Sequence, residues 1–147
     1  MSGVTAEASN RVAVLLIEDN AGDVTLMREA LKDCSCSLDL EVARDGEEAA
    51  ARLFGADASL PQLIILDLNL PGIDGHTILA RLRKSDSRTA HIPVIVVSSS
   101  QNPSDIEQSY LLGANAYMSK PSNLNQFEDH ARQICRIWIE PISRIPR

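Results

Sequence analysis

The sequence lacks several features that would assign it to common classes of protein. No apolar run approaches the roughly 20 residues of a membrane-spanning helix, and residues 1–10 show no basic stretch followed by an apolar one, as a secretory signal would. The net charge is −6 and no block of Lys or Arg occurs, which argues against nucleic acid as a partner because phosphate contacts need clustered positive charge. No GxxxxGK[ST] motif is present, so a P-loop nucleotide site is excluded. These absences predict a cytoplasmic protein.

The few cysteines and histidines show no spacing typical of metal ligands or catalytic groups. Cys34 and Cys36 are close in sequence, Cys135 is distant, and no CxxC motif occurs. This pattern is typical of reduced thiols in the core or at the surface of a cytosolic protein. The histidines have no evident Ser or Cys partner, and we assign no catalytic role to any of them: His76, His91 and His130.

Short apolar runs alternate with helical patterns along the chain. The runs, rich in β-branched residues, predict strands at Val12–Ile17, Leu38–Ala43, Leu63–Leu66, Val94–Val97 and Ala116–Ser119. Apolar residues at helical spacing follow each run, and the last helical stripe is expected to end at Pro141. This alternation predicts an α/β fold with a doubly wound, flavodoxin-like sheet of five parallel strands in the order 2-1-3-4-5 and helices on both faces.

The 147 residues of the chain correspond to one domain. We expect a leader at residues 1–10, the folded domain at 11–140 and a tail at 141–147. This division leaves no room for a separate output module.

Polar residues stand where the predicted strands end. Glu18 and Asp19 follow the first strand, Asp67 follows the third, Ser98 ends the fourth and Lys120 follows the fifth. The carboxyl ends of parallel strands share one edge of the sheet, where ligands bind at the reversal of strand order. We therefore expect the three acids to converge there.

Converging carboxylates repel one another, and a divalent cation with oxygen ligands, best Mg²⁺, would relieve the repulsion. Asp67 could then attack phosphorus to give an acyl phosphate, while Lys120 and Ser98 stabilise the phosphoryl oxygens. Taken singly, each residue has a simpler explanation: Asp19 and Asp74 as helix N-caps, Asp67 as a loop acid, Lys120 as a solvated side chain. Because all of these residues stand at or near predicted strand ends, a shared functional site is favoured over the separate explanations.

Four segments resemble the receiver domain of two-component response regulators, and the resemblance spans about Val12 to Trp138. The segments are Val14–Asn20, Leu66–Gly75, Pro93–Ser98 and Gly113–Pro121. Two residues differ from the commoner choices of the family without loss of a functional group, because Glu18 replaces Asp and Ser98 replaces Thr. Ser122 stands where many members carry an aromatic residue.

The resemblance implies a role for each matching residue. Asp67 matches the phosphoacceptor, Lys120 the conserved lysine of the family, and Ser98 the switch hydroxyl. The metal ligands would be Glu18, Asp19, Asp67 and the backbone carbonyl of Asn69. Tyr117 matches the aromatic switch, although a half-buried packing tyrosine is the alternative. The Lys120–Pro121 bond is commonly cis in the family.

The implied function is that of a phosphorylation switch rather than a turnover enzyme. A sensor histidine kinase would phosphorylate Asp67, and the surface of the fourth helix, fifth strand and fifth helix would change and engage a protein partner. Glu18-Asp19-Asn20 with Asp23, the segment 98–110 and Ile137-Trp138-Ile139 look like the stand-alone regulators of bacterial phytochrome kinases. A phosphate relay or sink and a purely structural interaction module are alternatives. An aspartyl phosphohydrolase is disfavoured, because its second Asp is replaced by Asn69.

Apolar residues are unusually dense at the C-terminus. Ile137, Trp138 and Ile139 are consecutive and cannot all face one core, and Ile142 and Ile145 follow Pro141. We expect a homodimer whose interface contains the three consecutive residues. The alternative is a tail folded back over its own domain.

Overall fold

The computed structural model describes residues 11–56, 58–84 and 87–146, which form a five-stranded parallel sheet with helices on both faces. The strands are β1 (Val12–Ile17), β2 (Leu38–Ala43), β3 (Leu63–Leu66), β4 (Val94–Ser98) and β5 (Ala116–Ser119). Their order is β2-β1-β3-β4-β5 and every pairing is parallel. The predicted fold class and strand order are confirmed. The predicted leader lies outside the described residues.

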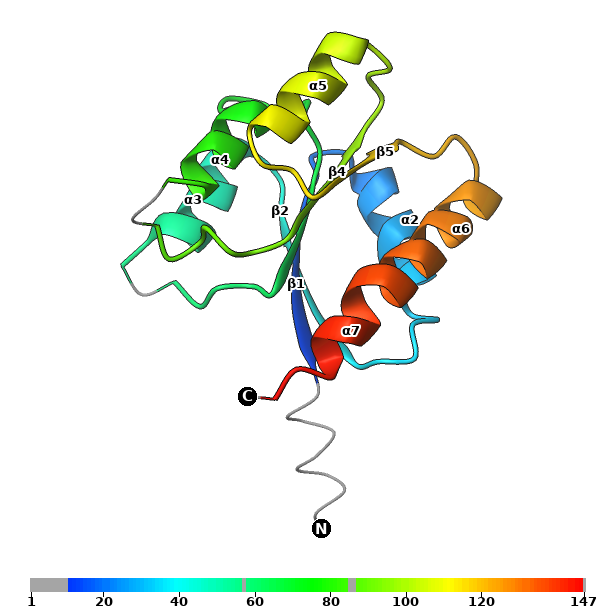
Figure 1. Cartoon of the computed structure of the whole chain (residues 1–147). Coiled ribbons are helices and arrows are strands. Elements are labelled where there is room, and N and C mark those ends of the chain that lie inside the picture. Colours follow the sequence, from blue (N-terminus) through cyan, green and yellow to red (C-terminus); the bar gives the residue numbers. More distant parts are fainter. Residues whose placement is uncertain (1–10, 57, 85–86, 147) are drawn as a thin grey trace.

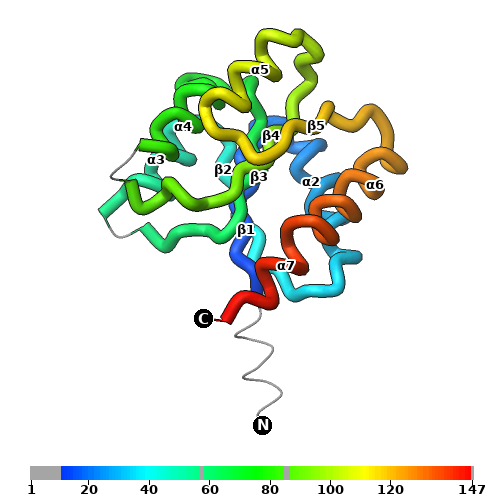
Figure 2. Tube along the Cα trace, in the orientation of Figure 1, coloured from blue at the N-terminus to red at the C-terminus, as the bar shows by residue number. Residues whose placement is uncertain are grey.

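The helices cover the sheet on its two sides, as Figures 1 and 2 show from the same direction. On one side are α2 (Ala21–Leu31) and α6 (Leu124–Ile134), and on the other α3 (Gly46–Phe54), α4 (Gly75–Leu82) and α5 (Pro103–Leu111). Each of these helices begins after an Asn or Asp whose side chain accepts a backbone N–H of the first turn: Asn20, Asp45, Asp74, Asn102 and Asn123. Asp74 is therefore an N-cap. For α2 the cap is Asn20 and not Asp19.

The sheet separates two apolar cores. Every residue of β3 and β4 is buried, which explains why these strands are continuously apolar instead of alternating. Val14, Leu16 and Ile65 face the core beneath α2 and α6, whereas Leu15 and Ile64 face the core beneath α3 and α4. Burial of each such side chain contributes roughly 1.5–3 kcal/mol. The rigid centre of the sheet therefore lies directly behind the residues that end β1, β3 and β4.

The C-terminal helix does not end at Pro141, which corrects the sequence prediction. α6 continues into a π-helical turn, η1 (Cys135–Ile139), and then into α7 (Glu140–Ser143). The Glu140 N–H reaches back five residues to the Cys135 carbonyl, and Pro141 occupies the first turn of α7. The hydrogen-bonding register changes at η1, so the helix needs no backbone N–H donor from Pro141, and proline is tolerated there.

The same register change alters which C-terminal residues face the core. Ile139 is fully buried, and Trp138 and Ile142 pack against the core beneath α2 and α6. Ile137 and Ile145 stay exposed. The alternative of a tail folded back over its own domain is therefore what the structure shows for Ile142. Ile139 is withdrawn from the predicted interface because the monomer core already buries it.

Candidate functional site

Three acids meet at the carboxyl edge of the sheet. β1 and β3 are neighbours with Ile17 opposite Leu66, so the residues that follow them, Glu18 and Asp67, emerge side by side. Glu18 is 5% exposed and Asp67 is 4% exposed, whereas Asp19 is exposed. Each of the three offers a carboxylate oxygen within 4.8 Å of the others. The structure thus brings together the acids that the sequence placed at separate strand ends.

Backbone hydrogen bonds fix the loop that carries Asp67. The Asp67 N–H donates to the Ile17 carbonyl at 3.0 Å, and the Asn69 N–H donates to Asp67 Oδ1 at 3.1 Å. The Gly75 N–H donates to the Leu68 carbonyl at 3.0 Å. A Cβ atom on Gly75 would lie 2.8 Å from the Asp67 carbonyl oxygen and 2.7 Å from Leu68 Cα, so only glycine allows α4 to start this close to the acid.

Lys120 joins the acids from the end of β5. Its N–H donates to the Ser98 carbonyl at 2.8 Å, which continues the β4–β5 ladder. Its Nζ lies 2.8 Å from Glu18 Oε1, 2.8 Å from Asp23 Oδ2 and 3.2 Å from Asp67 Oδ2. Lys120 is therefore not a solvated lysine. Asp23, in the first turn of α2, was not predicted as the partner of Lys120, and no spacing in the sequence indicates this contact.

Burial and neighbouring charges shift the pKa values of Glu18 and Lys120. Burial raises the pKa of Glu18 to about 7; Lys120 opposes this rise and Asp67 adds to it. For Lys120, burial alone would lower the pKa, but the bonds to Asp23 and Glu18 outweigh it and the pKa lies above its ordinary value. Three carboxylates contact the one ammonium group and Asp19 adds a fourth acid to the cluster, which leaves an excess of negative charge. An all-oxygen donor set with this charge fits a hard divalent cation.

Ser98 and Tyr117 are linked through one residue of the β4–α5 loop. Ser98 is fully buried, and its Oγ accepts the Ser100 N–H at 3.2 Å. The Tyr117 hydroxyl donates to the Ser100 carbonyl at 2.8 Å, and the Tyr117 N–H donates to the Tyr110 hydroxyl at 3.1 Å. Tyr117 also packs, half-buried, against the core beneath α3 and α4.

The Lys120–Pro121 bond differs from the expectation that the resemblance gave. Every peptide bond among the described residues is trans, and Lys120–Pro121 is one of them. The trans form is the more stable one even before proline, by about 0.5–1 kcal/mol.

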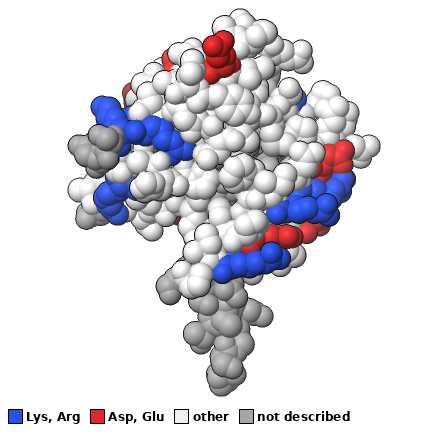
Figure 3. Space-filling model, viewed as in Figure 1, with Lys and Arg blue, Asp and Glu red and all other residues white. Residues whose placement is uncertain are grey.

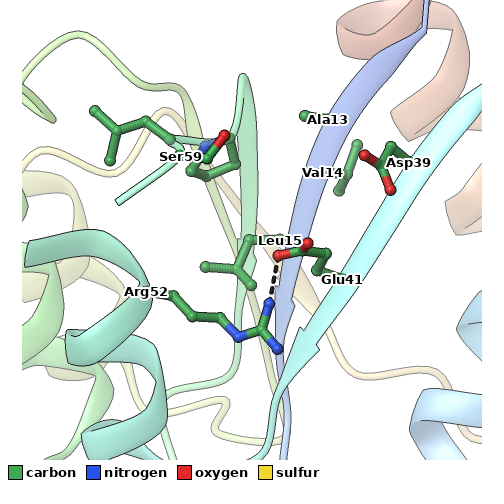
Figure 4. Close-up of a pocket in the computed structure, with 9 residues that line it drawn as sticks. Ala13, Val14, Leu15, Asp39, Glu41, Arg52 and Ser59 are labelled. Atoms are coloured by element: carbon green, nitrogen blue, oxygen red, sulfur yellow. Dashed lines mark hydrogen bonds and ion pairs between the residues drawn. The ribbon is translucent and has the colours of Figure 1, made fainter. Parts of the chain in front are cut away.

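A hollow of about 50 Å³ lies over β1 and β2. Figure 4 shows Arg52 of α3 reaching toward Glu41 of β2, with which it forms an ion pair, beside Leu15. None of the predicted site residues lines this hollow.

This fold, with acids and a lysine at its carboxyl edge, defines a class of signalling domain. Residues 14–132 match the family described as the response regulator receiver domain. The chain belongs to this family.

Response regulators that match nearly the whole chain include one that belongs to a phytochrome system. Response regulator Rcp1 of Synechocystis sp. is 34% identical over 141 residues, which cover 93% of this chain and 95% of Rcp1. The Mn²⁺-bound form of Rcp1 superimposes with a TM-score of 0.83 at 35% identity, covering 92% of this chain and 99% of that one. The phosphorylated cyanobacterial phytochrome response regulator RcpA gives a TM-score of 0.82 at 40% identity, covering 89% and 96%.

These likenesses confirm the resemblance found in the sequence. The protein is a response regulator receiver domain related to phytochrome response regulators, and its acid cluster suits a divalent metal. Domains of this family are phosphorylation switches that interact with histidine kinases. Within the described ranges, no helix has the length and apolar character needed to cross a bilayer.

Proposed function

We propose that Asp67 accepts a phosphoryl group from a sensor histidine kinase in a reaction that requires Mg²⁺. The observation that carries this proposal is the convergence of a buried Asp67 with Lys120 Nζ at 3.2 Å and two further acids. Glu18, Asp19, Asp67 and the backbone carbonyl of Asn69 would hold the metal ion. When bound, the ion neutralises charge on the phosphoryl oxygens.

The chain's own residues prepare the transfer. Asp67 Oδ1 is held by the Asn69 N–H and Oδ2 faces Lys120, so the carboxylate is fixed for attack on phosphorus with little reorganisation. The Asp67–phosphorus bond forms as the bond from phosphorus to the donor histidine nitrogen breaks. Lys120 supplies a mobile positive charge to the phosphoryl oxygens, and Ser98 donates its hydroxyl to one of them.

The link through Ser100 suggests how phosphorylation changes the surface. When the Ser98 hydroxyl turns to a phosphoryl oxygen, the Ser100 N–H loses its acceptor and the loop moves. Tyr117 is tied to the Ser100 carbonyl and moves with it. The surface formed by α5, β5 and α6 then changes.

This surface is suited to a protein partner. Figure 3 shows that the centre of the face bearing α5 and β5 is nearly free of charged residues, which lie toward its margins. On α5, Tyr110 is 49% exposed and Leu111 is 79% exposed. An uncharged, partly apolar face of this kind fits protein contact and not nucleic acid.

The proposed role is that of a cytoplasmic switch and not a turnover enzyme. Asn69 stands two residues after Asp67, where an aspartyl phosphohydrolase would place its general acid, and an amide cannot donate the proton that a leaving group needs. A phosphate relay or sink would use the same acceptor chemistry without a partner on the α5 face.

The likeness to Rcp1 and RcpA supports a phytochrome-type histidine kinase as donor. An autophosphorylated bacterial phytochrome kinase should transfer its labelled phosphoryl group to this protein at least about tenfold faster than an unrelated histidine kinase does, a difference equivalent to 1.4 kcal/mol. The measurement is the loss of label from each kinase over time. Equal transfer rates from the two kinases would contradict the phytochrome assignment while leaving the acceptor role intact.

We also propose that the protein forms a homodimer through the C-terminal helical segment. Ile137 is 58% exposed and the half-buried Trp138 is its neighbour, so an apolar patch is available on η1. Sedimentation of the wild type should give twice the chain mass of 16.0 kDa, and Ile137→Glu should give a monomer because burying an unpaired carboxylate is unfavourable. The matched control is Leu124→Glu, an exposed leucine at the start of α6. A wild type that stays monomeric with and without phosphodonor would contradict this proposal.

A further inference from the structure

The three cysteines, which are far apart in sequence, gather at one place in the fold. Cys34 and Cys36 lie in the loop between α2 and β2, and Cys135 begins η1. Both loop cysteines pack against the core that contains Cys135, and all three are free thiols. Figure 1 shows this loop passing beside the C-terminal helical segment. Because α2 and α6 both run back from the carboxyl edge of the sheet, the thiols lie at the opposite end from Asp67.

A hollow gives solvent access to two of these thiols. It has a volume of about 130 Å³, and Cys34 and Cys135 both line it, together with Arg132, Arg136 and Glu140. A space of this size admits several water molecules and therefore a peroxide molecule. Cys34 is half-buried, whereas Cys135 is 6% exposed, so a small polar oxidant meets Cys34 first.

The environments of the two thiols differ in a way that assigns their order of reaction. Burial raises the pKa of the Cys135 thiol, and the neighbouring Cys34 raises it further. Cys135 therefore stays protonated and is a poor first nucleophile, since the thiolate is the reactive form. Cys34 is the more accessible thiol and has Cys135 beside it to complete a disulfide.

The loop also holds the C-terminal segment in place. The Ser35 hydroxyl donates to Glu140 Oε1 at 2.8 Å, and the Cys36 thiol donates to the Ser143 hydroxyl at 3.3 Å. These two hydrogen bonds connect the cysteine loop to the segment η1–α7. A covalent bond between the loop and this segment would fix the part of the chain that carries Ile137 and Trp138.

We propose that Cys34 and Cys135 form a peroxide-sensitive dithiol site that closes to a disulfide. The Cys34 thiol attacks one oxygen of hydrogen peroxide, which gives a sulfenic acid and releases water. The Cys135 thiol then attacks the Cys34 sulfur, the sulfur–oxygen bond breaks, and a second water leaves with the remaining proton. The dithiol loses two electrons and the peroxide gains them. Reversible disulfides of this kind serve as redox sensors in reducing compartments.

The test uses the full chain, reduced, freed of reductant, treated with hydrogen peroxide, alkylated and digested with trypsin without reduction. We expect the peptide 33–44, which holds Cys34 and Cys36, to be joined to the peptide 133–136, which holds Cys135. Dithiothreitol should separate them. Cys36→Ser should keep the joined peptides, and Cys34→Ser should lose them.

Two further measurements show whether the fold directs the bond. The oxidised wild type should unfold at a higher temperature than the reduced protein, because a link across about 100 residues restricts the unfolded chain, and oxidised Cys34→Ser should show no such rise. The same oxidation in denaturant should give mixed pairings. The proposal is overturned if peroxide joins Cys34 to Cys36, if Cys135 is alkylated in the treated wild type, or if Cys34→Ser forms the same joined peptides.

Discussion

Acetyl phosphate with Mg²⁺ is expected to add one phosphoryl group to the wild-type protein and none to Asp67→Asn. The amide is close in shape to the carboxylate and can still accept the Asn69 N–H through its oxygen, so the loop after β3 should keep its conformation. It lacks the nucleophilic oxygen that forms the acyl phosphate. Intact-mass measurement after a fixed incubation gives the result directly, and the added group should be lost in base.

The control for this experiment is Asp39→Asn. Asp39 is an exposed acid on β2, and its register partner Ala13 lies near the start of β1, far from the carboxyl edge. This variant should gain the same single group as the wild type. An equal gain of mass in Asp67→Asn would show that another residue is the acceptor.

Asp19→Asn is expected to weaken Mg²⁺ binding at least about tenfold and to slow phosphorylation strongly. Asp19 is the exposed member of the three acids, so its charge contributes to the metal site with little role in packing. The thermal midpoint of the wild type should rise with added Mg²⁺, since a ligand at 100 times its dissociation constant stabilises a fold by about 2.7 kcal/mol. At the same Mg²⁺ concentration the variant should show a much smaller rise.

Calorimetric titration provides the affinities, and chelation of the metal should return the wild type to its lower thermal midpoint. Asp39→Asn again serves as the control for loss of one negative charge. An undiminished Mg²⁺ affinity in Asp19→Asn would remove this residue from the ligand set. A normal phosphorylation rate without metal would show that Lys120 alone neutralises the phosphoryl oxygens.

The sequence by itself determined the elements and the order of the polar residues. The short, continuously apolar runs at β3 and β4 indicate strands that are covered on both faces. Helical periodicity and helix caps such as Asp74 are likewise encoded within a few residues. Once the alternation of strands and helices sets a parallel sheet, the residues that end its strands must share an edge. For this reason the sequence alone groups Glu18, Asp19, Asp67 and Lys120 at one site.

Only the tertiary structure decided the contacts that depend on how helices pack across the sheet. Asp23 pairs with Lys120 because α2 begins beside the end of β5, and no spacing in the sequence records that approach. The π-helical turn rotates Ile139 into the core and carries the chain past Pro141, which helical periodicity does not predict. Cys34 and Cys135, about 100 residues apart in sequence, line the same hollow because α2 and α6 pack side by side. The local sequence pattern determines each helix and strand, whereas these contacts between distant residues depend on long-range packing.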